Sequence, residues 1–127
     1  MAALVLLAHG SPDPEWIRPI EHSAARLREL APLHFVTIAT LDAGSFAVAV
    51  DRCLAAGHDD IRVLAYFMSA GGRHLQRDIP ALVLAARERH PTATITLIPG
   101  ALGVADEVLD ALARAALRLA ALPKTSG

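Results

Sequence analysis

Four nearly continuous apolar runs, each followed by a stretch with helical spacing, constrain the fold of this chain more than any other feature. The runs cover residues 3–8, 33–41, 61–68 and 93–98, and they are rich in Val, Ile, Leu and aromatic residues. Strands that are apolar at nearly every position are typical of a parallel sheet covered by helices on both faces. The sequence therefore predicts an α/β fold built on a parallel sheet.

Helical patterns occupy the segments between and after these runs. The first helix is expected to begin somewhere from Pro14 to Pro19, because proline suits a first helical turn but removes a hydrogen bond from an established helix. The second helix is expected over residues 45–56 and stops at Gly57, a typical C-terminal signal. The fourth is expected over residues 104–122.

The third helix is expected to begin with Asp78 and Pro80, which look like a capping acid and an early proline, and to continue to about Arg89. Strands and helices then alternate along the whole chain. Right-handed crossovers between parallel strands give an open four-stranded sheet flanked by helices, with the flavodoxin-like order 2-1-3-4. We expect a single domain over residues 1–122 and a frayed tail over residues 123–127.

Composition excludes several classes of protein. The 127 residues carry 12 basic and 13 acidic side chains, so no basic face for nucleic acid is expected. No apolar stretch reaches the ~20 residues of a membrane span, and the N-terminal apolar run lacks the basic start of a signal peptide. With Cys53 as the single cysteine, neither an intrachain disulfide nor a cysteine zinc site is possible, and a reducing, cytoplasmic setting fits.

Two histidines and a carboxylate follow the expected strands at the point where ligands bind in such sheets. With the order 2-1-3-4, that point lies beyond the carboxyl ends of strands 1 and 3. His9 and Ser11 follow strand 1, residues 71–74 (Gly-Gly-Arg-His) follow strand 3, and Asp42 follows strand 2. We therefore expect His9 and His74 to face one cavity, with glycines that let the backbone approach a ligand.

Two imidazoles at one cavity suit two kinds of chemistry. Neutral imidazole binds cobalt, nickel, iron or zinc. It also accepts protons near neutral pH, because an unperturbed histidine titrates at about 6.5. Insertion of a metal into a macrocycle needs both functions, since two pyrrole N–H protons leave as the metal enters.

Two sequence motifs resemble those of a known family. Leu-Ala-His-Gly-Ser at residues 7–11 and Gly-Gly-Arg-His-Leu-Gln-Arg-Asp-Ile-Pro at residues 71–80 look like signatures of the sirohydrochlorin chelatases, in their short, single-domain CbiX-type form. The second motif is the more specific of the two. The resemblance extends from strand 1 to the fourth helix, and the chain length matches the short form.

The resemblance implies an activity and an assembly. It implies that His9 and His74 contact the metal and accept protons, and that the chain inserts cobalt, iron or nickel into sirohydrochlorin for cobalamin or siroheme-type synthesis. The metal is then a substrate, and no permanently bound cofactor is expected. The short form is also implied to work as a homodimer, which agrees with a physical argument: one small sheet edge covers only part of a flat macrocycle.

Several candidate residues have a structural alternative. Family members usually carry Leu-Glu after strand 2, followed shortly by proline, whereas here Leu41-Asp42 is followed by Ala-Gly-Ser. Asp42 is therefore either a site carboxylate or a cap of the second helix. Ser11 either binds substrate or forms a turn before proline. Arg73 and Arg77 are candidates for contacts with substrate carboxylates, with Gly72 beside Arg73 as a further substrate-binding residue. The alternative is that both arginines belong to a solvated basic edge.

Two other functions use the same residues. A non-catalytic carrier of a tetrapyrrole or metal would need the same fold and histidines. A phosphate-ester enzyme would use the glycines near Arg73 as an anion cradle and His9 as nucleophile, but the sequence has no P-loop pattern and no arginine directly before His9. The chelatase is the main hypothesis; the sequence hardly separates it from a carrier, and turnover would, because a carrier binds one equivalent and stops.

Overall fold

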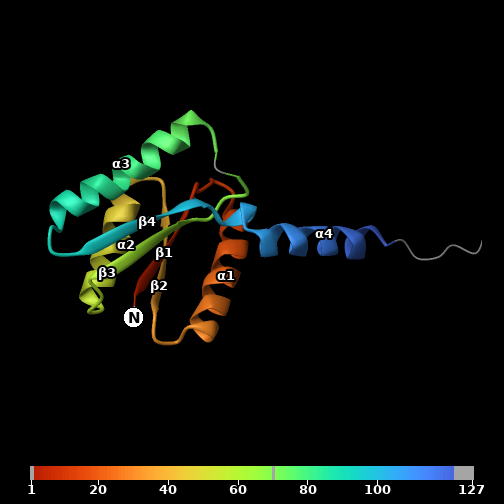
Figure 1. Cartoon of the computed structure of the whole chain (residues 1–127), viewed down its shortest axis with the longest axis horizontal. Coiled ribbons are helices and arrows are strands. Elements are labelled where there is room, and N and C mark those ends of the chain that lie inside the picture. Colours follow the sequence, from red (N-terminus) through yellow and green to blue (C-terminus); the bar gives the residue numbers. More distant parts are fainter. Residues whose placement is uncertain (1, 70, 122–127) are drawn as a thin grey trace, which may run out of the picture.

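The structure, a computed structural model, describes residues 2–69 and 71–121, and it contains one four-stranded parallel sheet (Figure 1). The strands are β1 (Ala3–Ala8), β2 (Phe35–Thr40), β3 (Asp60–Ala65) and β4 (Thr94–Ala101). Their order across the sheet is β2-β1-β3-β4, and all three neighbouring pairs are parallel. The predicted fold class and strand order are confirmed.

Four α-helices connect and follow the strands: α1 (Ile17–Leu30), α2 (Ala43–Ala55), α3 (Arg73–Arg89) and α4 (Asp106–Ala120). Short 3-10 turns precede α1 and α4, at Pro14–Trp16 (η1) and Leu102–Val104 (η2). None of the helices in the described part of the chain is both long and apolar enough to cross a membrane. The expected tail, residues 123–127, lies outside the described residues.

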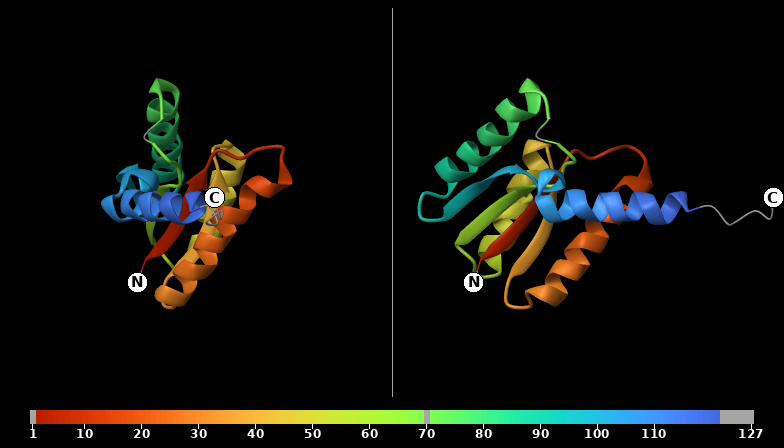
Figure 2. Two further views of the ribbon diagram at one scale, coloured as in Figure 1. Left: turned by 90° about the vertical axis from the view of Figure 1, so that its right-hand side faces the viewer. Right: turned by 45° about the vertical axis from the view of Figure 1, so that its right-hand side comes forward.

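The helices cover the two faces of the sheet unequally. Successive side chains of a strand point to opposite faces. Val5 and Leu7 of β1 therefore belong to a core formed with α2 and α3, whereas Leu6 and Ala8 belong to a second core formed with α1. Helix α4 covers neither face and runs outward from the carboxyl edge of the sheet (Figures 1 and 2).

Helix α3 begins earlier than the sequence predicts. It starts at Arg73 with Gly72 as N-cap, so Asp78 and Pro80 lie inside the helix and Asp78 is not its cap. A proline in a helix interior costs a backbone hydrogen bond. Buried side chains one turn apart offset that cost by packing on the sheet: Leu75, Ile79, Val83 and Ala86. Because this stripe includes Leu75 and Ile79, the first two turns are held helical.

Strands β3 and β4 also differ from the predicted bounds. The strand β3 ends at Ala65, three residues before the end of the apolar run. The strand β4 continues through Pro99 and Gly100 to Ala101, beyond its expected end at residue 98. The pairing shifts register between Val63 and Ala65, so β4 carries an irregularity that accommodates the proline.

A side chain from α1 partly covers the open edge of the sheet at β2. Arg28 of α1 reaches across to β2, where its Nη2 donates to the Val36 carbonyl oxygen over 2.9 Å. At the same end of the sheet, the His34 ring Nδ1 lies 2.9 Å from the Ala2 backbone nitrogen and 2.8 Å from its carbonyl oxygen. His34 thus holds the start of the chain at the amino edge of the sheet, away from the carboxyl edge.

Candidate functional site

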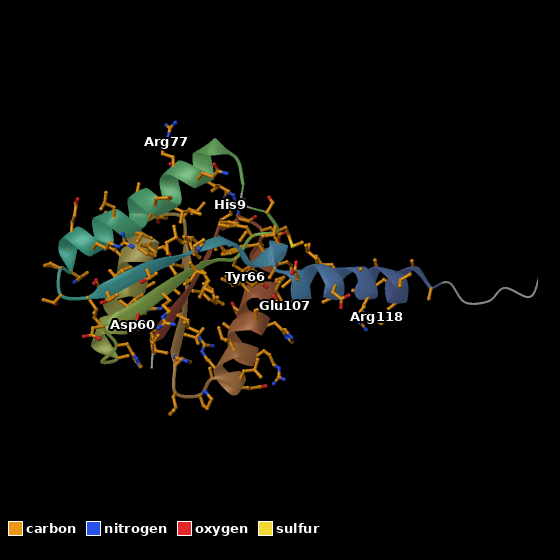
Figure 3. The ribbon with its side chains drawn as sticks, viewed as in Figure 1. His9, Asp60, Tyr66, Arg77, Glu107 and Arg118 are labelled. Carbon is orange, nitrogen blue, oxygen red and sulfur yellow. The ribbon has the colours of Figure 1, made fainter. Side chains whose placement is uncertain are left out.

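His9 occupies the carboxyl edge of the sheet, directly after β1 (Figure 3). Its side chain is exposed to solvent. The ring of Phe67, from the loop after β3, meets the imidazole edge-on, with centroids 5.1 Å apart and the planes at 72°. Edge-to-face contacts of aromatic rings are favourable and directional. Phe67 therefore orients an imidazole whose other sides remain open to a ligand.

Tyr66, next to Phe67, ties this loop to the first helix. Its backbone nitrogen donates to the Leu7 carbonyl oxygen over 2.8 Å, which continues the pairing of β1 and β3 past the last strand residue. Its hydroxyl donates to the Pro19 carbonyl oxygen over 3.1 Å and lies 2.8 Å from Ser23 Oγ. These contacts of Tyr66 with β1 and α1 thus fix the position of the neighbouring Phe67 next to His9.

Ser11 forms a turn between β1 and η1. Its Oγ accepts a hydrogen bond from the Asp13 backbone nitrogen over 3.1 Å, and Asp13 in turn caps η1 by accepting from Glu15 N. The side chain of Ser11 is exposed. The turn interpretation is therefore observed, and the hydroxyl stays at the edge where a substrate would bind.

Asp42 caps α2. Its Oδ1 accepts a hydrogen bond from the Gly44 backbone nitrogen over 3.0 Å, as an N-cap residue does. The carboxylate is exposed and follows β2, the neighbour of β1, so it lies at the same edge of the sheet as His9. The capping alternative is observed, and it leaves one carboxylate oxygen for a second role.

Replacing Asp42 with alanine is expected to lower the free energy of unfolding by about 1 kcal/mol, because α2 loses its cap. Urea unfolding measures this. Asp42→Asn keeps a capping acceptor and removes the charge, so it should unfold near the wild-type midpoint. An unchanged midpoint for Asp42→Ala would contradict the cap.

The loop after β3 leads into α3 at the same edge. Gly71 has a φ of 78°, in the left-handed region, and a Cβ there would collide with the Leu75 side chain. Glycine is therefore required for the close approach of the loop to α3. Gly72 is the exposed N-cap of α3 and has no side chain with which to cap the first turn.

His74 is the second residue of α3, in its first turn, and Arg73 is the first. Their side chains are not among those that the structure describes. Since β1 and β3 are paired neighbours, the loop that carries His9 and the loop that leads into α3 lie side by side at one edge. The structure thus brings together the two segments that carry the predicted histidines. Arg77 is exposed and points outward from α3, away from the sheet (Figure 3).

An apolar cavity of about 280 Å³ opens between the start of α3 and β4. Its walls are made largely of aliphatic and proline side chains, among them Ala65, Leu75, Ile79, Leu97, Pro99 and Ala101. Because Ala65 and Ala101 end their strands and Leu75 lies in the first turn of α3, the cavity adjoins the edge that carries the histidines. The site therefore has an apolar wall beside a polar edge.

The remaining titratable groups lie elsewhere. Among the side chains that the structure describes, which do not include that of His74, no three His, Cys, Asp or Glu gather as a preformed metal site. Cys53 is buried in α2, and burial raises the pKa of its thiol to about 11, so it stays protonated at neutral pH. His58 stacks on Phe35, and His90 Nε2 lies 3.3 Å from Asp51 Oδ1. Both of these histidines contact side chains outside the candidate site.

Neither Tyr66 nor Phe67 was predicted from the sequence to be part of the site. A signal was available, because both stand at the end of the third apolar run, just before the loop that carries the second motif. The sequence pattern places both residues inside the expected strand over residues 61–68. In the structure they extend past Ala65, the end of β3, into the edge where a ligand would bind.

Comparison with known proteins places these features in a family. A family model for CbiX matches residues 3–119. A protein described as a cobalamin (vitamin B12) biosynthesis CbiX protein from Marinobacter aquaeolei VT8 is 27% identical, with a TM-score of 0.80, and the match covers 94% of this chain and 97% of that chain. None of the curated proteins compared with the chain matches it.

SirB from Bacillus subtilis, solved with Fe3+, shares the fold at 18% identity, with a TM-score of 0.77. The match covers 96% of this chain and 49% of that chain, so this chain spans about half the length of SirB. Because the CbiX model matches from β1 into the last turn of α4, the protein belongs to the CbiX family.

Proposed function

We propose that this chain is a chelatase that inserts a divalent metal ion into a sirohydrochlorin-type tetrapyrrole. The observation that carries the proposal is the exposed imidazole of His9, held edge-on by Phe67, at the sheet edge where α3 begins with His74 in its first turn. Membership of the CbiX family and the likeness to a CbiX protein of cobalamin biosynthesis support the same activity. Cobalt and iron are the proposed metals, with nickel as a further substrate.

The proposed reaction exchanges protons for a metal ion. Two pyrrole N–H protons leave the macrocycle as one divalent metal enters, so the site must present the metal and accept protons on one side of the ring. A neutral imidazole nitrogen does either. We assign both roles to the pair His9 and His74: the lone pair of one imidazole holds the incoming metal while the other accepts a pyrrole proton and passes it to solvent.

The edge beside these histidines suits a flat, acidic macrocycle. The apolar wall formed by Leu75, Ile79 and Leu97 offers a surface for the ring. The N-terminal end of α3, whose N-cap Gly72 has no side chain, favours an anionic group, and Arg73 would add a guanidinium for substrate carboxylates. Ser11 adds a hydroxyl at the same edge. These contacts would orient the ring with its nitrogens toward the histidines.

We further propose that the active form is a homodimer. His9 is exposed at the carboxyl edge of the sheet. That edge alone would cover only one side of a macrocycle. The match with this chain covers about half of the SirB chain. SirB therefore provides a precedent for a larger molecule that contains this domain. Two copies of this chain would supply a comparable amount of structure around one substrate.

An anaerobic absorbance time course tests the proposal, with sirohydrochlorin in excess over the protein and cobalt, iron and nickel supplied in turn. We expect multiple turnovers above the spontaneous rate with at least one metal. The relative rates then rank the metals. Absence of acceleration with all three metals would contradict the chelatase.

A carrier of tetrapyrrole or metal is the second candidate, favoured by one observation. The carboxylate of Asp42 is engaged as a cap, so its availability for proton transfer is reduced. A carrier would bind one equivalent of the macrocycle and stop, without accelerating insertion. The same time course therefore separates the two functions, because only an enzyme exceeds one turnover.

A further inference from the structure

A second cavity, of about 420 Å³, lies at the opposite end of the sheet from the candidate site. It opens along the start of β2, the edge strand of the sheet, and its other walls come from the end of α1 and the last turn of α2. Phe35, in its wall, pairs with Ala3 at the start of β1, whereas His9 follows Ala8 at the other end of that strand. The cavity and the candidate site therefore share no residue.

The side chains that line this cavity bring positive charge without a counter-charge. Two guanidinium groups and one imidazole line it, from Arg28, Arg52 and His34. Among the described residues, no Asp or Glu belongs to its walls, and neither arginine forms an ion pair. Carboxylates and phosphates are the groups that arginine binds best. The cavity thus offers an anion two cations that the fold leaves unneutralised.

The two arginines approach the edge strand from opposite faces of the sheet. Helix α1 packs on one face and α2 on the other, so Arg28 and Arg52 flank β2. The Arg28 guanidinium is held in place by its 2.9 Å hydrogen bond to the Val36 carbonyl oxygen, which uses one of its five N–H donors. Because His34 turns Nδ1 toward Ala2, its Nε2 is the ring nitrogen left for a ligand.

A buried hydroxyl without a partner lies in the wall of the same cavity. Thr37 lines the cavity and is only 6% exposed. Its neighbours on the same face of β2, Phe35 and Ala39, belong to the core formed with α2, so Thr37 faces the helix that carries Arg52. Its hydroxyl makes no hydrogen bond with any of the described residues. Burial of an unpaired hydroxyl costs free energy, which a ligand in the cavity would recover.

We propose that this cavity binds the phosphate group of a small anion, either inorganic phosphate or a phosphate monoester. The guanidinium groups of Arg28 and Arg52 hold the phosphate from the two faces of the sheet, and the Thr37 hydroxyl donates to a third oxygen. A tetrahedral phosphate with about two negative charges has at least three oxygens for these three groups. A planar carboxylate has two oxygens and one charge, so it fits the set less well.

The proposed anion site does not depend on the proposed chelatase. It lies at the amino edge of the sheet, and neither the metal nor the tetrapyrrole is needed to fill it. A ligand that binds only the folded chain stabilises the fold in proportion to its occupancy. We therefore expect phosphate to raise the melting temperature of the protein even when no metal or tetrapyrrole is present.

Calorimetric titration of the full chain with inorganic phosphate tests the proposal, in chloride buffer at pH 7.5 and constant ionic strength. We expect saturable binding of one phosphate per chain, at least about 10-fold tighter than that of acetate. No saturable binding, or equal affinity for acetate, would overturn the proposal. Phenyl phosphate identifies the source of the group: tighter binding than inorganic phosphate supports an ester whose organic part contacts Phe35, and equal or weaker binding supports free phosphate.

Arginine variants assign the binding to this cavity. Arg52→Gln and Arg28→Gln should each weaken phosphate binding at least about 10-fold, since each loses a charge-assisted hydrogen bond. Two exposed arginines outside the cavity provide controls: Arg26, on the same helix as Arg28 and paired with Glu29, and Arg89, in the last turn of α3. Arg26→Gln and Arg89→Gln should bind as the wild type does. Equal affinities for all four variants would contradict the site.

Thr37→Val separates a ligand-binding hydroxyl from a structural one. The variant keeps the shape of the buried side chain and removes an unpaired polar group, so its melting temperature without phosphate should equal or exceed that of the wild type. Its affinity for phosphate should fall about 5-fold, because one neutral hydrogen bond is lost. A lower melting temperature together with unchanged affinity would make the hydroxyl structural and overturn its place in the site.

Discussion

Replacing His9 with alanine is expected to lower the turnover number for metal insertion by at least about 100-fold, the usual contribution of a positioned acid or base. The imidazole is exposed at the sheet edge, so its loss removes a group that meets the substrate directly. The fold should survive, because His9 follows β1 and its side chain is outside both buried cores. Initial rates at saturating sirohydrochlorin measure the effect.

His22→Ala provides the control for this variant. His22 is also exposed, but it lies on α1, outside the candidate site, so its removal should leave the rate unchanged. Thermal unfolding of both variants separates a catalytic loss from a loss of structure. Near-normal turnover by His9→Ala would remove His9 from the mechanism and leave His74 as the only histidine assigned to it.

Replacing His74 with alanine is expected to abolish metal insertion, again by at least about 100-fold. The proposed chemistry needs one group for the metal and another for the pyrrole protons, so a single remaining imidazole cannot perform both at once. His74 occupies the first turn of α3, whose packing depends on Leu75 and Ile79, and alanine is a better helix former than histidine. The helix should therefore remain.

Arg77→Ala is the matched control on the same helix, since this side chain points away from the sheet and is exposed (Figure 3). It should insert metal at the wild-type rate. Metal binding measured by calorimetry adds a second readout: weaker cobalt binding by His74→Ala would make His74 the metal-holding member of the pair. Turnover by His74→Ala within a few-fold of wild type would contradict its role.

The sheet could be predicted from the sequence because its strands are mostly apolar and the central strand β1 is apolar on both faces. Val5, Leu6 and Leu7 are each buried, so no polar alternation obscures the strand, and β1 matches its predicted bounds. The parallel arrangement and the strand order followed from alternation of strands and helices. The placement of His9 followed from the same topology, since a residue after a central strand lies at the switch point.

The start of α3 could not be predicted, because local and tertiary preferences conflict there. Asp78 and Pro80 have the local chemistry of a helix beginning. The burial of Leu75 and Ile79 against the sheet outweighs it, and burial depends on residues distant in sequence. The contact of Phe67 with His9 was missed for the same reason, since the two residues meet only after β1 and β3 pair.

The guanidinium of Arg28 has a consequence for how copies of this molecule associate. A parallel sheet with an open edge strand can grow by adding a strand from another chain. With the Val36 carbonyl oxygen already occupied at 2.9 Å, an incoming strand would have to displace Arg28 before it could pair along β2. Arg28 thus opposes the addition of strands from other copies, and with it fibre-like growth, at that edge of the sheet.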